Sequence, residues 1–302
     1  MSLFASLAAL IWGHFWPQLT DLPARKIAHS QRWLLDHFNA GGVQHGVLAW
    51  TLGVLAPALL LGLLAAMAAG LLGLLGWIFD VVVLYFLFGF RCVSFKATQV
   101  ARALAADDFA AARSNLLAWN PALVVGDGPA ELTRQTLEET LKASLITFFG
   151  VLFWYWLAGV AGAVLYTLSH VCFEQWQSEV VFAKFARQVV YWLDWLPARA
   201  LGFSFAIVGN FQDAAESWRD QAAAWGKLQG DDNEGVILAA GAGALGIRLG
   251  GALHLAGCEV MRPELGTGEE PEPESIDAAI ALIWRAALLW LSVAGLLWLG
   301  SL

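Results

Sequence analysis

One segment of this chain is too long and too apolar for an ordinary water-soluble fold. Residues 47–90 include a single charged side chain, Asp80. A hydrocarbon core about 30 Å thick is crossed by roughly 20 helical residues, so this segment is long enough to cross it twice. We predict two membrane-spanning helices, at residues 47–69 and 71–90, with a hinge near Gly70.

Composition extends this conclusion to the whole chain. Of the 302 residues, 59% are hydrophobic and 14% are charged, against about 45–50% and about 25% in soluble proteins. Three further apolar segments cover residues 2–19, 143–171 and 286–302. We therefore predict an all-α, polytopic helical membrane protein, with about four to six transmembrane or re-entrant helices and with amphipathic cytoplasmic helices. Residues 1–302 are expected to form a single integral membrane domain.

The basic residues predict how the chain is threaded through the membrane. All 17 lysines and arginines lie in three blocks, at residues 25–32, 91–142 and 184–285. Because positive residues stay on the cytoplasmic side, the first two blocks fit a hairpin formed by residues 47–90. The third block joins them only if residues 143–171 enter and return, or if residues 191–211 cross back.

Glycines in segment 143–171 favour the first of these arrangements. Gly159 and Gly162 interrupt the run WYWLAGVAGAVLYTL. A broken helix is tolerated in a membrane where protein or water satisfies its backbone. We predict an in-and-out hairpin of half-helices here. A transport role would add a water-accessible cavity around Asp80 and this break.

Polar segments at residues 91–142 and 172–285 separate the apolar ones. In KATQVARALAADDFAAARSNLLAW, apolar residues recur at helical spacing, which predicts two amphipathic helices. Asp107 or Asp108 is placed to accept hydrogen bonds from the first amides of the second helix.

A further helix is predicted from Glu131 into the fourth apolar segment, after the turn Gly-Asp-Gly-Pro. Three charged residues close its cytoplasmic end: Glu138, Glu139 and Lys142. A charged face of this kind is expected to be solvated.

Charge and side-chain spacing exclude several functions. The net charge is −8, and without clustered lysine or arginine the chain is not suited to nucleic acid, because these residues replace the counterions of the phosphates. The three cysteines are isolated, so neither a disulfide framework nor a zinc site is indicated. The six histidines lack metal-ligand spacing, and no resident metal or cofactor is expected.

The stretch YWLDWLPARALGFSFAIVGNF places two opposite charges in an apolar setting. Pro197 suits the first turn of a helix, so we predict a helix from Pro197 to Val208. Arg199 then lies where the helix dipole disfavours a cation, and Asp194 is the nearest anion in sequence. We expect Asp194 and Arg199 to form a structural ion pair, with contact between this pair and a ligand as the alternative.

A second candidate region is VILAAGAGALGIRLGG. Gly241, Gly243 and Gly246 have the spacing of a dinucleotide-binding turn, but the surrounding sequence lacks the alternation of strands and helices that such a fold requires. Small residues at this spacing instead let helices approach closely in membranes. Arg248 requires an anionic partner, either a carboxylate or a ligand phosphate.

Any ligand site is expected on the cytoplasmic face. The candidate ligand- or anion-binding residues are Arg199, Arg248, Arg262 and Glu264. Arg199 and Arg248 would bind an anionic small molecule or a lipid headgroup. No catalytic residue and no metal ligand is assigned. The expected partners are the lipid bilayer and a second copy of the chain.

Several segments resemble known families of integral membrane proteins. LDWLPARALGFSFAIVGNFQDAAESW resembles a segment of the AmpE family, bacterial inner-membrane proteins named as signalling modulators of β-lactamase induction. AGALGIRLGG, followed by RPELGTG and an acidic Pro-Glu-Pro run, resembles the C-terminal signature of the CobD/CbiB family, the membrane-bound adenosylcobinamide-phosphate synthases of cobalamin biosynthesis. ALAADDFAAAR is similar to an acidic turn of that family, so the resemblance covers most of the chain.

The resemblance to the CobD/CbiB family implies an ATP- and magnesium-dependent ligation of an aminopropanol unit to a corrinoid carboxyl group. The family's acidic motifs would supply carboxylates for the metal and polar groups for a phosphate. This chain departs from them: NPALVVGDG has no Arg-Asp pair, KASLIT replaces an acidic motif, and Tyr166–Ser169 replaces Asn-Thr-Leu-Asp. A synthase would have to recruit other acids, such as Asp127, Glu138 or Asp194.

These departures set the expectation for function. We expect a multi-pass protein of the bacterial inner membrane that is regulatory and not an enzyme, an AmpE-type modulator of cell-wall or β-lactamase signalling. The first alternative is an active adenosylcobinamide-phosphate synthase, which alone would use magnesium and ATP. The second alternative is a membrane ligand-binding or transport protein.

Overall fold

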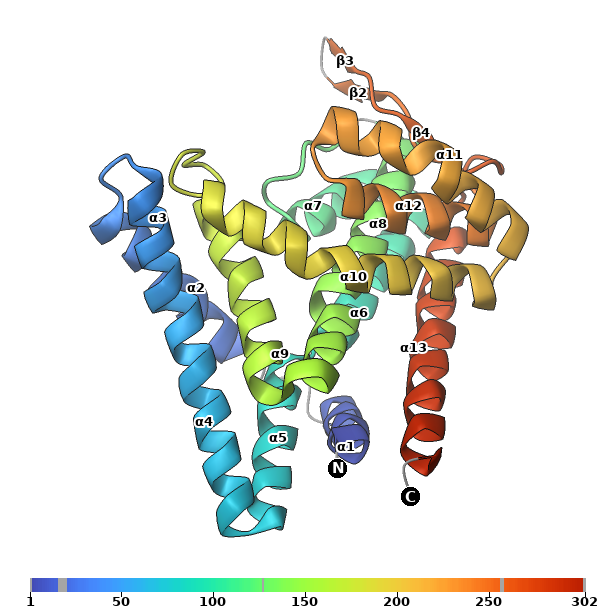
Figure 1. Cartoon of the computed structure of the whole chain (residues 1–302). Coiled ribbons are helices and arrows are strands. Elements are labelled where there is room, and N and C mark those ends of the chain that lie inside the picture. Colours follow the sequence, from blue (N-terminus) through green and yellow to red (C-terminus); the bar gives the residue numbers. More distant parts are fainter. Residues whose placement is uncertain (1, 16–20, 127, 256–257, 301–302) are drawn as a thin grey trace. The chain divides into compact units, whose positions relative to one another are not determined.

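The computed structural model describes residues 2–15, 21–126, 128–255 and 258–300, and helices dominate it (Figure 1). The helices are α1 (Ser2–Phe15), α2 (Asp21–Phe38), α3 (Val43–Trp50), α4 (Ala56–Leu71), α5 (Gly73–Leu87), α6 (Phe90–Ala105), α7 (Phe109–Trp119), α8 (Pro129–Ser144), α9 (Gly150–Trp176), α10 (Lys184–Val208), α11 (Phe211–Gln229), α12 (Asp232–Leu245) and α13 (Glu274–Gly300). Two π-helical turns, η2 (Thr51–Leu55) and η3 (Leu145–Phe149), precede α4 and α9. Four short strands are added to them: β1 (Leu249–Gly250), β2 (Leu253–Leu255), β3 (Cys258–Val260) and β4 (Glu264–Leu265).

The chain divides into two compact units. Unit 1 comprises residues 1–91 and 146–197, and unit 2 comprises residues 92–145 and 198–302. Four helical stretches among the described residues are long and apolar enough to cross a membrane, at residues 43–71, 73–105, 129–176 and 274–300. The predicted helical, multi-pass membrane protein is confirmed. The expectation of a single integral membrane domain over residues 1–302 stays a prediction.

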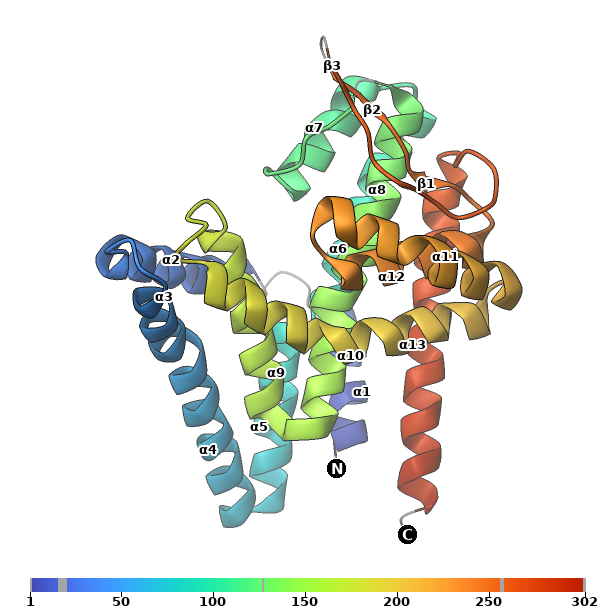
Figure 2. The same ribbon diagram turned by 45° about the horizontal axis from the view of Figure 1, so that its top comes forward.

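The apolar run at residues 47–90 forms the predicted pair of helices in unit 1. Turn η2 joins α3 to α4, and the chain reverses at Leu72 before α5 begins. Figures 1 and 2 both show α4 and α5 side by side and antiparallel. A Cβ added at Gly76 would lie 2.7 Å from the Cα of Ala69. The close contact of the two helices therefore depends on a glycine, as in other membrane helix pairs.

Helix α9 is broken in its middle, as the predicted in-and-out hairpin requires. Ala158 (φ −131°, ψ 16°) and Gly159 (φ 62°, ψ −153°) leave the helical region, and Figures 1 and 2 show the ribbon reversing there. A side-chain atom added at Gly150 would overlap the ring of Tyr166, although these residues would be about 24 Å apart in a straight helix. The two limbs of α9 therefore run antiparallel and touch.

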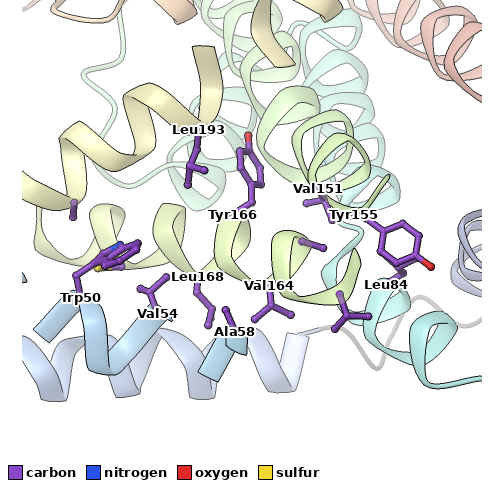
Figure 3. Close-up of a cluster of buried hydrophobic side chains, with 14 of the residues drawn as sticks. Trp50, Val54, Ala58, Leu84, Val151, Tyr155, Val164, Tyr166, Leu168 and Leu193 are labelled. Carbon is purple, nitrogen blue, oxygen red and sulfur yellow. The ribbon is translucent and has the colours of Figure 1, made fainter. Parts of the chain in front are cut away.

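The core of unit 1 lies between these helices. Trp50 and Val54 pack there with Val164 and Leu168 of α9 (Figure 3). The other face of α4 is more than half exposed at Leu59, Leu60, Leu63 and Met67. An exposed face this apolar is suited to contact with lipid.

Unit 2 contains a tight pair of helices, α11 and α12. A Cβ added at Gly243 in α12 would overlap the backbone of Asp213 in α11. A Cβ at Gly241 would lie 2.8 Å from Cδ1 of Leu141 in α8. Gly246 ends α12 in the left-handed conformation, with φ of 67°. These glycines therefore serve helix packing and helix termination, which confirms the packing interpretation of their spacing.

Of two predicted helix starts, one is observed in the structure and the other is not. Asp108 caps α7 and accepts a hydrogen bond of 2.9 Å from the amide of Ala111. Helix α10, in contrast, continues unbroken through Pro197, so the prediction that a helix begins there is wrong. Leu193 and Leu201 are buried on either side of the proline, and their packing outweighs the roughly 3 kcal/mol that an interior proline costs.

Replacing Gly150 by alanine should destabilise unit 1. The added methyl group meets the buried ring of Tyr166, and overpacking of this kind costs about 1–3 kcal/mol. Gly70→Ala is the matched control, because a Cβ at Gly70 meets nothing within 4 Å. Thermal unfolding of the protein purified in detergent measures both variants. A melting midpoint of Gly150→Ala equal to that of the wild type would contradict the contact between the two limbs of α9.

Candidate functional site

The candidate site of unit 2 is organised by α8, PAELTRQTLEETLKAS. Despite its polar sequence, the helix is buried along most of its length, with Glu131 5%, Glu138 3% and Glu139 7% exposed. The expectation of a solvated charged face is therefore wrong. Burying a carboxylate is unfavourable unless it is paired and hydrogen-bonded, so each of these side chains needs partners within the protein.

Glu138 is paired with Arg262. The guanidinium donates from Nη1 to Oε2 at 2.8 Å and from Nη2 to Oε1 at 3.1 Å, and the amide of Gly250 donates to the same carboxylate at 2.9 Å. Arg262 also donates to the carbonyl oxygens of Gly250 and Gly251, each at 3.2 Å. Both glycines have positive φ, of 69° and 72°, a region that glycine enters at little cost. One ion pair thus fixes a sharply bent segment, residues 246–251, which we call the glycine arc.

Two more side chains of α8 hold the segment that follows. Arg134 donates to the carbonyl oxygens of Gly250 and Ala252, at 2.9 and 3.4 Å. Glu131 accepts a hydrogen bond of 3.0 Å from the amide of His254, and its Oε1 lies 2.6 Å from Nδ1 of that histidine. Helix α8 therefore holds both β1 and β2 in place. Strand β1 pairs antiparallel with β4, and β2 pairs antiparallel with β3.

A second polar cluster joins α8 to the start of α12. The ammonium group of Lys142 lies 2.6 Å from Glu139 and 3.2 Å from Glu234. Asn120, which follows α7, donates to Glu139 at 3.1 Å. Two carboxylates therefore share one ammonium group, and an amide from a third element completes the cluster.

Arg199 and Arg248 lie at opposite ends of α12. Arg199 donates to Oδ1 of Asn233, in the first turn of the helix, at 2.9 Å. Arg248 follows Gly246, which ends the helix. Because α12 has 14 residues and is about 20 Å long, the two guanidinium groups do not converge on one small anion. A separate role for each in anion binding stays a prediction.

The candidate residues of the glycine arc and β4 differ in availability. The side chain of Arg262 is 9% exposed and is engaged by Glu138, so its guanidinium is structural. Arg248 is exposed, and within the part of the chain that the structure describes its side chain has no hydrogen bond or ion pair. Glu264 is also exposed and lies opposite Gly250 in the pairing of β4 with β1. The arc therefore presents Arg248 as its available cation.

In unit 1, Asp194 belongs to a hydrogen-bonded cluster with α9. Its Oδ1 accepts from the hydroxyl of Tyr166 at 2.7 Å and lies 3.0 Å from Nε2 of His170. Asp194 is 5% exposed, so the cluster is buried. These partners were not expected from the sequence, and the ion pair of Asp194 with Arg199 stays a prediction.

A resident magnesium ion would need oxygen ligands that lie close together. Among residues 2–15, 21–126, 128–255 and 258–300, no three histidine, cysteine, aspartate or glutamate side chains lie close enough to hold a metal ion. Of the acids that a synthase would recruit, Glu138 is engaged by Arg262, Asp194 belongs to unit 1, and Asp127 lies outside the described residues. The described residues therefore do not form a ready-made site of three such ligands.

A signal for the buried face of α8 is present in the sequence. Glu131 and Glu138 are seven residues apart and therefore lie on the same side of the helix. Leu132 and Leu137 occupy other sides. A helix with apolar residues on several sides and acids aligned on another is surrounded by protein, and its acids then require basic partners.

These features indicate a multi-pass helical membrane protein. One unit carries a bent helical hairpin, and the other carries a buried ionic site with a glycine arc. The profile described as "CobD/Cbib protein" matches residues 3–283 of the 302. The chain therefore belongs to the CobD/CbiB family.

Several curated relatives are named for cobalamin biosynthesis. The "Cobalamin biosynthesis protein CobD" of Stutzerimonas stutzeri (strain A1501) is 36% identical over 273 residues, which cover 86% of each chain. Its namesake from Chromobacterium violaceum is 35% identical over 263 residues, 83% of this chain and 81% of its own. The one from Klebsiella pneumoniae is 29% identical over 285 residues, 89% of this chain and 84% of its own. No solved structure matches the chain.

These relatives correct the expected function. The expectation of a non-catalytic AmpE-type signalling modulator is not supported, because the family and the named relatives point to cobalamin biosynthesis. That expectation rested on departures from short acidic motifs, at KASLIT and at Tyr166–Ser169. Similarity over most of the chain outweighs them, because the whole fold must be kept to carry a site.

Arg262→Lys should loosen the glycine arc. Lysine keeps the charge but loses the two parallel hydrogen bonds to Glu138, and weakening a buried pair in this way should cost about 2–4 kcal/mol. Arg219→Lys is the matched control, because Arg219 pairs with Asp220 on the exposed surface and such pairs contribute little. Melting midpoints and the rate of proteolysis within residues 246–266 measure the effect. Equal behaviour of the two variants would contradict the role of the Glu138–Arg262 pair.

Proposed function

We propose that this chain is an adenosylcobinamide-phosphate synthase of cobalamin biosynthesis. The family match over residues 3–283 carries the proposal, and relatives named for cobalamin biosynthesis, similar over most of the chain, support it. In the reaction, the amino group of an aminopropanol phosphate forms an amide with a corrinoid carboxyl group, and the displaced carboxyl oxygen leaves on the phosphate that is released from ATP.

In this proposal the glycine arc binds the phosphate-bearing part of a substrate. Arg248 supplies an exposed guanidinium, which suits a phosphate because it is always charged and donates from several N–H groups. Glu138 and Arg262 are positioning residues that hold the arc against α8. Magnesium enters with ATP as part of a substrate.

We also propose the bacterial inner membrane as the location. The blocks of basic residues favour the cytoplasmic side, where ATP is available. A second copy of the chain and an anionic lipid headgroup are further proposed partners. The headgroup is proposed because an exposed arginine near a membrane attracts anionic lipid.

Activity of the purified protein tests the synthase proposal. With adenosylcobyric acid, aminopropanol phosphate, ATP and magnesium, the wild-type protein should release adenosylcobinamide phosphate, measured by mass spectrometry. The relative from Stutzerimonas stutzeri is assayed in parallel. Absence of product from this chain, under conditions in which the relative forms it, would contradict the proposal.

Arg248→Ala should lower kcat/KM for the phosphate-bearing substrate by roughly 10–100-fold, because a hydrogen bond to a charged group contributes about 1.5–3 kcal/mol. Arg219→Ala is the matched control, since Arg219 is exposed and paired with Asp220. The melting midpoint of each variant separates lost binding from lost folding. A folded Arg248→Ala enzyme with the kcat/KM of the wild type would remove Arg248 from the substrate site.

A further inference from the structure

A cavity of about 390 Å³ lies within unit 1. Aliphatic side chains of α4 form one wall, residues 158–161 at the break of α9 form another, and Asp80 of α5 lines it as well. All of these residues belong to unit 1. A cavity therefore lies around Asp80 and the break in α9, and its access to water, which a transport role would require, stays a prediction.

Among the residues that the structure describes, Asp80 is the one ionisable side chain that lines this cavity. It lies halfway along α5, a helix that is otherwise apolar. Its Oδ2 accepts a hydrogen bond of 2.7 Å from the hydroxyl of Tyr155, and Figure 3 shows that hydroxyl pointing away from Val151 and Val164. Among the residues that the structure describes, no donor reaches Oδ1 of Asp80. One oxygen is therefore held in place while the other is available.

The break in α9 brings backbone polar groups to the same cavity. Ala158 and Gly159 interrupt the helix, and a Cβ added at Gly159 would meet nothing within 4 Å. A broken helix at membrane depth is stable where protein or a polar cavity serves its freed backbone groups. One limb ends here and the next begins, so their dipoles oppose one another. Because opposed dipoles largely cancel, the negative charge of Asp80 is what favours a cation in the cavity.

We propose that this cavity binds a primary ammonium group carried on an apolar body. Asp80 supplies the countercharge, Tyr155 orients it, and the aliphatic wall of α4 takes the apolar body. Charged side chains within membrane-spanning segments are paired, and among the described residues no cationic side chain lines this cavity. The site goes beyond the synthase proposal and does not depend on it.

Photolabelling of the full-length protein in detergent tests the site. The probe is hexylamine with a diazirine at its far end, and hexanol with the same diazirine is the uncharged control probe. The amine should label residues 59–69 and 158–161, as mapped by peptide mass spectrometry, and unlabelled hexylamine should compete with it. Equal labelling by both probes, without competition, would overturn the proposal.

Variants separate binding from folding. Asp80→Asn should weaken labelling by the amine by about tenfold or more, whereas Asp80→Glu keeps the charge and should retain most of it. Ala66→Phe fills the cavity and should abolish labelling, whereas Met67→Phe, a neighbour on α4 outside the cavity lining, should not. Full labelling of Asp80→Asn, loss of labelling in a folded Asp80→Glu protein, or equal labelling of the two phenylalanine variants would each overturn the proposal.

An amine of this kind can come from water or from lipid, and reconstitution distinguishes the two sources. The amine probe is applied to the protein in nanodiscs of phosphatidylcholine alone and of phosphatidylcholine with phosphatidylethanolamine. Competition by phosphatidylethanolamine would assign the site to an amine-bearing lipid. Undiminished labelling in both membranes would assign it to a free amine.

Discussion

Hydrocarbon cannot donate or accept hydrogen bonds, so every polar group in a membrane-spanning segment must find its partner within the protein. In unit 1 this constraint governs the break at Ala158–Gly159, where the two limbs of α9 lie against each other. In unit 2 the same logic applies to α8, whose acids are buried. Glu138 is matched by Arg262 and by the amide of Gly250, and the glycine arc takes its shape from that match.

Hydropathy and small residues predicted much of unit 1 because they report contact with lipid and with other helices directly. The run at residues 47–90 became α4 and α5, and the glycines of segment 143–171 marked the reversal of α9. The packing role of the glycines in α12 was predicted on the same basis. Pro197 misled the prediction because local propensity takes no account of the burial of Leu193 and Leu201.

The ionic partners of unit 2 were beyond local sequence reasoning. Glu138 and Arg262 are 124 residues apart, and nothing in the sequence around either one specifies the other. The expectation of a solvated face for α8 rested on its charged residues alone and took no account of the leucines beside its aligned acids. The functional expectation failed for a related reason, because the chain departs from short motifs of the family while its likeness to the family extends over residues 3–283.

The tight hairpin of α9 also constrains how the chain is inserted into the membrane. Its limbs touch at Gly150, and a side chain at Gly162 would overlap the carbonyl of Trp154, so the limbs cover each other closely. A first limb released alone would expose the interrupted backbone at Ala158 to lipid, which is costly. Entry of the two limbs into the bilayer as one paired element avoids this cost.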